Sequence, residues 1–150
     1  MPDEASVGQE QNRVNHEVDS LHRYFICANR MRYYLDETVK EVGLVPPADL
    51  IEMHYRGTRL FTHLSCWLGL LYVVIEGWKS LRLSDPKIDK LLASPNVARL
   101  NQFRNGVFHF QKAYYDKRLQ GFLHTKDNKT VWADSVHREF SRYFLEQYGE

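Results

Sequence analysis

Apolar residues recur at three- and four-residue spacing through most of the chain, a pattern typical of helices that bury one face. The first such stretch, residues 14–42, predicts one long amphipathic helix ending near Gly43. Residues 45–47, Val-Pro-Pro, stop it because proline cannot continue a helix. A second long helix is predicted from about residue 49 to 81. Nearly every position of residues 66–75 is apolar, so we expect this helix to be central.

Two proline-led starts follow, each with a capping side chain just ahead of the proline. Ser84-Asp85-Pro86 predicts a short helix through Leu92, and Ser94-Pro95 opens a helix that we extend to Tyr115. Residues 114–128 have a weaker pattern and are interpreted as looser chain with a loop. A last helix is predicted over residues 131–148.

No stretch alternates as a strand would, so the sequence predicts an all-α fold. We expect a single-domain antiparallel bundle of four to five helices over residues 11–150. Residues 1–10 are polar and aperiodic, and we interpret them as a flexible leader.

Charge is nearly balanced overall, at a net +1, which argues against binding nucleic acid by bulk electrostatics. Its distribution is uneven. Residues 1–20 carry a net charge of −4 and residues 99–118 a net charge of +4. The basic stretch could contact a few phosphates, with Arg99 and Lys112 as weak candidates for RNA contacts, or it could be an ordinary charged helix face.

Two cysteines, Cys27 and Cys66, fall inside helical patterns and are interpreted as buried thiols in a reducing compartment. The N-terminus is polar and acidic, unlike a signal peptide. The longest apolar run, residues 66–75, is shorter than the about 20 residues that span a bilayer. These features predict a cytoplasmic protein with no membrane partner.

The chemistry that the sequence offers is concentrated in residues 100–115. On a helix, Asn105 and His109 are four apart and share a face turned away from the apolar stripe, whose members are Leu100, Phe103, Val107 and Phe110. Arg104 falls between the two faces. Gly106 costs about 1 kcal/mol relative to alanine inside a helix. A close approach by another backbone or a substrate would explain it, and so would a local kink.

The segment Arg104-Asn105-x-x-x-His109 resembles the motif of the HEPN family, which is an Arg, four to six residues and a His, with a polar residue after the Arg. The resemblance implies a small helical bundle. It also implies a metal-independent endoribonuclease whose composite site forms where two such helices meet across a homodimer. No cofactor and no metal are expected. Such enzymes commonly act as toxins or phage-defence effectors, with an antitoxin or another protein as a possible partner.

By this resemblance, His109 would act as general acid or base on the ribose 2′-hydroxyl of an RNA substrate, because imidazole exchanges protons near neutral pH. Arg104 would hold the scissile phosphate and stabilise its negative charge. Asn105 would orient His109 or the phosphate. In some family toxins a tyrosine two positions after the histidine is modified, but Gln111 occupies that position here.

The sequence also contains other arrangements of these residue types. Arg56 with His63, and Arg118 with His124, satisfy the same loose spacing. Two Asp-x-x-His pairs on the first and last long helices have a spacing that can reach one metal ion, but both His are expected on helix flanks. These pairs are Asp19 with His22 and Asp134 with His137.

The sequence therefore predicts a dimeric HEPN-like ribonuclease that uses Arg104, Asn105 and His109. Its rival is a HEPN-like binding or dimerisation module whose motif face recognises a protein or nucleotide partner without catalysis.

Overall fold

The chain is all-helical in the computed structural model, which describes residues 4–114, 116–123 and 129–149. These residues form six helices and no strand, so the predicted fold class is confirmed. The helices are α1 (Glu4–Leu44), α2 (Leu50–Ser80), α3 (Pro86–Leu92), α4 (Asn96–Phe108), α5 (Lys117–Leu123) and α6 (Lys129–Tyr148).

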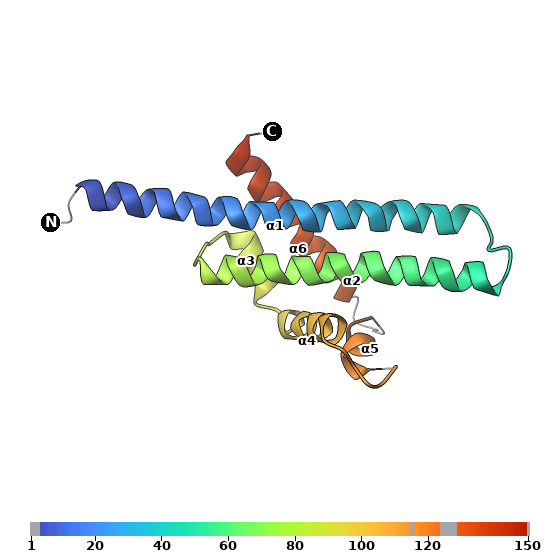
Figure 1. Ribbon diagram of the computed structural model, residues 1–150. Helices are drawn as coiled ribbons and strands as arrows, with labels where there is room; N and C mark the ends of the chain where they lie inside the picture. The colour runs from blue at the N-terminus through green and yellow to red at the C-terminus, as the bar shows by residue number, and fades with distance from the viewer. Residues whose placement is uncertain (1–3, 115, 124–128, 150) are drawn as a thin grey trace.

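Helices α1 and α2 form a long antiparallel hairpin that the other helices pack around (Figure 1). Its turn is fixed by two reciprocal bonds at the start of α2. The Asp49 carboxylate accepts from the Glu52 backbone N–H at 2.8 Å, and the Glu52 carboxylate accepts from the Ala48 N–H at 2.7 Å. This reciprocal cap satisfies amide donors that a helix start leaves unpaired. The predicted second helix is confirmed to within one residue at each end.

Helix α2 is the central helix, as its apolar run predicted. Its middle and C-terminal part contributes six fully buried apolar side chains, Trp67, Leu68, Leu71, Val74, Ile75 and Trp78. Helix α6 crosses behind the hairpin, and α4 and α5 lie together along its lower side (Figure 1). From α6, Val136, Phe140 and Phe144 complete the core.

Helix α1 is buried only in its middle. Its buried residues run from Leu21 to Thr38, whereas Val14 and Val39, which belong to the predicted apolar stripe, are 39% and 54% exposed. The stripe continues past the part of α1 that other helices cover. Residues 4–10 of the predicted leader belong to this helix, and residues 1–3 lie outside the described residues.

Two short elements differ from the prediction. Residues 117–123, interpreted as loose chain, form helix α5, so the described chain has six helices rather than four to five. Helix α4 ends at Phe108, not at Tyr115. The two differences have one cause, because the chain reverses after Phe108 and brings α5 back against α4.

The prediction of two buried thiols is wrong for Cys27, which is exposed on α1, while Cys66 is half-buried. Cys27 directly precedes the buried Ala28, and its side chain points away from the core.

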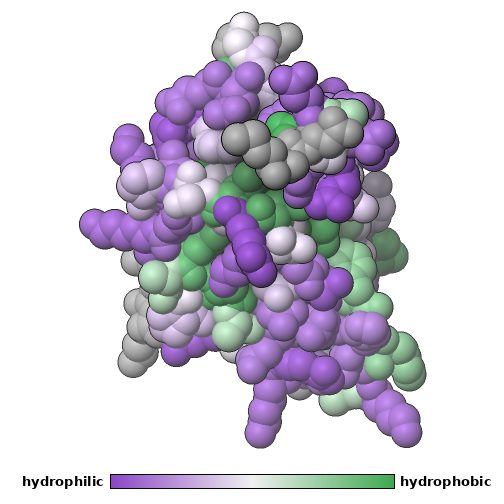
Figure 2. Space-filling model, turned by 90° about the vertical axis from the view of Figure 1, so that its left-hand side faces the viewer, coloured by the Kyte–Doolittle hydropathy of each residue, from purple (hydrophilic) through white to green (hydrophobic). Residues whose placement is uncertain are grey.

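Of the described helices, only α2 is long and apolar enough to cross a membrane. Only 39% of its most apolar stretch is buried in the fold, yet the core helix of a soluble protein meets the same criteria, so this is weak evidence. Seen along the hairpin, the end of the molecule that carries the start of α1 is mainly hydrophilic, with a hydrophobic area near its middle (Figure 2).

Candidate functional site

Helix α4 carries the Arg-Asn-x-x-x-His segment at its C-terminal end. Ser94 precedes the helix and its hydroxyl accepts from the Asn96 N–H at 3.1 Å. Leu100 and Phe103 are fully buried and fix α4 against the core, as the apolar stripe predicted. Position 110 departs from that stripe, because Phe110 follows the end of the helix and is 92% exposed.

His109 lies just outside the helix, in extended backbone with φ −119° and ψ 132°. Its N–H still donates to the Asn105 carbonyl at 3.1 Å, and its imidazole ring is exposed. On an ideal helix Arg104 and His109 would project in different directions. Because His109 lies outside the helix, this constraint on their relative positions does not apply. The side chain of His109 is free to turn toward a second molecule or a substrate.

Arg104 is half-buried and its guanidinium lies over the ring of Tyr72 on α2, 5.4 Å from the ring centroid. One Nη–H is 3.5 Å from the Asn105 Oδ1. Within the described residues no carboxylate lies within ion-pair distance of Arg104. Stacking on Tyr72 orients the guanidinium while leaving N–H donors for a ligand anion.

Tyr72 was not recognised from the sequence, because it lies inside an almost continuous apolar run. Burial raises the pKa of its hydroxyl; Glu76 raises it further, and Arg104 opposes the rise. Glu76 is exposed on the flank of α2. Tyr72 therefore links Arg104 of α4 to the flank of α2.

Two glycines allow close approach around the motif. A Cβ at Gly69 of α2 would lie 2.3 Å from the ring of Phe108, so that ring rests against the α2 backbone while remaining 57% exposed. A Cβ at Gly106 would lie 3.0 Å from Leu119 and 3.1 Å from Arg118 of α5. The close neighbours of Gly106 are thus side chains of α5 rather than the backbone or substrate that was expected.

The basic stretch around α4 is partly neutralised. Arg118 pairs with Asp116 at 3.1 Å and also contacts Gln111. Arg99 donates to the Asn96 side chain at 3.2 Å, and Lys112 is exposed. Arg99 and Lys112 therefore stay candidates for contacts with phosphate.

Arg56 and His63, which share the loose spacing, are used within the hairpin. Arg56 is 2.6 Å from Glu52 and also contacts the Val45 carbonyl. His63 Nδ1 is 2.9 Å from the Thr38 hydroxyl. His124, the partner considered for Arg118, lies outside the described residues.

The Asp-x-x-His pairs have other partners. His137 is buried, not on a flank as expected, and it bonds Trp67 and Asn29. Asp134 pairs with Arg32 at 3.1 Å and with Arg138 at 2.7 Å. His22 stacks on Tyr148. The part of the chain that the structure describes holds no group of three or more residues suited to a metal ion.

The fold and this site define an all-helical protein with an arginine, an asparagine and a histidine gathered at one helix end. No family model, curated protein or solved structure matches the chain.

Proposed function

We propose that the protein is a metal-independent endoribonuclease of HEPN type that acts as a homodimer through the end of α4. The observation that supports this most is Arg104, which is half-buried, oriented by Tyr72 and without a carboxylate partner among the described residues. Its remaining N–H donors are available to a ligand anion, and a phosphate diester suits its planar fork of donors.

The reaction needs a base to take the proton of the ribose 2′-hydroxyl and an acid to protonate the leaving 5′-oxygen. Attack of the 2′-oxygen on phosphorus breaks the bond to the 5′-oxygen and leaves a 2′,3′-cyclic phosphate. An imidazole can fill either role near neutral pH. One chain supplies one His109, so two chains related by a two-fold axis would supply both groups.

Two exposed aromatic side chains beside His109 support a partner at this surface. Phe108 is 57% exposed and Phe110 is 92% exposed, on either side of the histidine. Large exposed apolar side chains at one place are typical of an interface. A second α4 end packed here would bury them and bring the two His109 and two Arg104 side chains together. Asn105, 3.5 Å from Arg104, would hold the guanidinium in place.

A cytoplasmic toxin or phage-defence effector is the biological role that we propose, with an antitoxin or another protein as a possible regulator. This role rests on the resemblance of the motif. Arg99 and Lys112 would add weak contacts to the RNA backbone.

The test is cleavage of total RNA and tRNA in EDTA by the purified protein, compared with the variants His109→Ala and Arg104→Ala. Matched controls are His54→Ala and Arg30→Ala, which remove exposed residues of the same types outside the motif. We expect 2′,3′-cyclic phosphate ends that both motif variants abolish and both controls retain. Cleavage that survives in His109→Ala would refute the assignment, and so would a folded dimer that cleaves nothing.

The alternative to a ribonuclease is a binding module without catalysis, and the exposed surface beside His109 is the feature that favours it. Phe108 and Phe110, 57% and 92% exposed on either side of His109, would equally form the surface of the motif face that recognises a partner. A binding module predicts that His109→Ala weakens association, measured by sedimentation velocity, with no cleavage to lose.

A further inference from the structure

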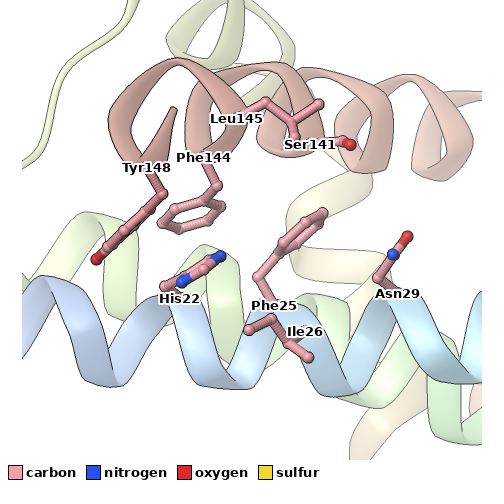
Figure 3. A pocket seen from close by; sticks show the side chains of 8 residues that line it. All are labelled: His22, Phe25, Ile26, Asn29, Ser141, Phe144, Leu145 and Tyr148. Carbon is pink, nitrogen blue, oxygen red and sulfur yellow. The ribbon is translucent and has the colours of Figure 1, made fainter. Parts of the chain in front are cut away.

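A pocket lies between α1 and the C-terminal half of α6, and it contains none of the motif residues (Figure 3). Its volume is about 480 Å³, within the range of small-molecule sites in proteins. Its lining residues are His22, Phe25, Ile26, Asn29, Ser141, Phe144, Leu145 and Tyr148.

Ring faces form one end of this pocket. The His22 ring stacks on Tyr148 with 4.1 Å between centroids and lies 4.9 Å from the Phe144 ring. Phe25 stacks on Phe144 at 5.2 Å. The Tyr148 hydroxyl donates to the Asp19 carboxylate at 2.5 Å, which holds that ring against α1. Phe25 and Phe144 are only 5% and 2% exposed, so a flat ring entering the pocket would meet mainly the half-buried His22 ring and the exposed Tyr148 ring, whose orientations are fixed by these contacts.

Asn29 is exposed and offers a hydrogen-bond donor whose orientation follows from a chain of bonds through the buried His137. The Trp67 indole can only donate, and it donates to His137 Nδ1 at 3.1 Å. Nδ1 is thus an acceptor, and the ring proton is on Nε2. Nε2–H then donates to the Asn29 Oδ1 at 3.0 Å. The Asn29 oxygen is used in this bond, and the amide NH₂ remains for a ligand.

The remaining lining residues of the pocket favour an uncharged ligand. Ser141 projects from α6 beside Asn29 and supplies a hydroxyl that can donate or accept (Figure 3). Among the residues that the structure describes, no lysine, arginine, aspartate or glutamate lines the pocket. A phosphate or carboxylate would therefore lack a counter-ion there, whereas an uncharged ring with polar atoms along its edge would find both stacking and hydrogen bonds.

We infer that this pocket binds one uncharged nucleobase, stacked on its aromatic wall with the polar edge of the base toward Asn29 and Ser141. Nucleobases combine a flat face with donors and acceptors on the edge, and stacking on aromatic side chains is a common way to bind them. The base could belong to a free nucleoside or to a strand of RNA. The inference does not rest on the ribonuclease proposal.

The buried chain of bonds supplies a reporter for binding. A ligand on Asn29 perturbs His137 and through it the indole N–H of Trp67, which gives a separate peak in a ¹H–¹⁵N spectrum. The two other indoles are internal controls, because Trp78 donates to Asp89 and Trp132 to the Leu91 carbonyl. We expect adenosine, cytidine or uridine to shift the Trp67 peak saturably and leave the other two in place.

Two variants test the contacts. Asn29→Asp keeps an oxygen for His137 and removes the NH₂ donor, so binding should weaken by about tenfold. Ser141→Phe fills the pocket and should abolish binding. Its matched control is Ser135→Phe on the same helix, outside this pocket. Retention of all three indole peaks would show that each variant is folded.

The outcomes separate the two sources of the base. Saturable shifts with nucleosides, lost in Ser141→Phe and kept in Ser135→Phe, support a free ligand. Shifts produced only by a short single-stranded RNA support a base of the strand. The inference is overturned if neither shifts Trp67 at millimolar concentration, if benzyl alcohol binds as well as a nucleoside, or if Ser141→Phe still binds. A ribonuclease test that fails would leave this result unaffected.

Discussion

The buried imidazole of His137 makes stability depend on pH. His137 is 6% exposed and bonds Trp67 and Asn29 through its two ring nitrogens. Burial and, to a smaller extent, the nearby Arg32 guanidinium lower its pKa from 6.5 to about 4, against the opposing effect of Asp134. The neutral ring fits the network because protonated Nδ1 could no longer accept from the Trp67 indole.

The direction of the effect follows from proton binding. Between pH 6.5 and 4 the unfolded chain binds a proton at His137 while the folded chain does not, so acidification favours unfolding. The contribution is complete above pH 6.5, declines as the pH falls and levels off below pH 4. The difference in pKa corresponds to about 3 kcal/mol in total, of which about 2 kcal/mol is lost between pH 7.5 and 5.

The assay is urea denaturation of the wild type and His137→Gln at pH 7.5, 6 and 5. Glutamine can accept from Trp67 and donate to Asn29 without titrating, and all other groups titrate alike in both proteins. We expect the free energy of unfolding of the wild type to fall by about 2 kcal/mol more than that of the variant. Equal declines in the two proteins would show that His137 is not held neutral, and would refute the reasoning.

Two pairs of substitutions test contacts that α2 makes. A Cβ at Gly77 would lie 2.5 Å from the buried Leu21 Cδ1, so Gly77→Ala should lower the free energy of unfolding by about 1–2 kcal/mol. Gly57→Ala, on the same helix with open space around it, should raise it by about 1 kcal/mol, and an equal response of both in urea denaturation would contradict this. Asp89→Ala leaves the buried Trp78 indole without its acceptor and should cost about 1–3 kcal/mol in thermal denaturation, whereas Asp89→Asn should cost less.

The helices that the sequence predicted well are those specified by local signals. Asp85 and Pro86 specify the start of α3, where the Asp85 carboxylate accepts from the N–H groups of Lys87 and Ile88. The start of α2 is set in the same way by Asp49. A cap needs only residues close in sequence, so it can be predicted without knowing the fold.

The errors arose where distant residues decide the structure. Helix α4 stops at Phe108 because α5 returns to Gly106, and the short, mixed segment that forms α5 has no strong period of its own. His137 is buried because Trp67, 70 residues earlier, donates to it. The pattern of α6 alone placed that histidine on a flank.

The motif residues themselves were predicted from spacing, but not their surroundings. The sequence indicated Arg104, Asn105 and His109 but could not indicate Tyr72 under the guanidinium or the extended backbone at His109. Both depend on how α4 packs against α2. Whether these residues cleave RNA stays a prediction for the cleavage assay.

The length of α1 has a consequence for how cooperatively the molecule unfolds. The helix has 41 residues, yet its buried side chains run only from Leu21 to Thr38. Residues 4–17 are exposed, so their helical turns can open without uncovering the core. The last turns before Leu44 differ, because Val42 is half-buried there and Glu41 pairs with Arg59 of α2 at 3.0 Å. Fraying at the N-terminal end is therefore a local equilibrium, separate from global unfolding, whereas the rest of α1 is held by its neighbours.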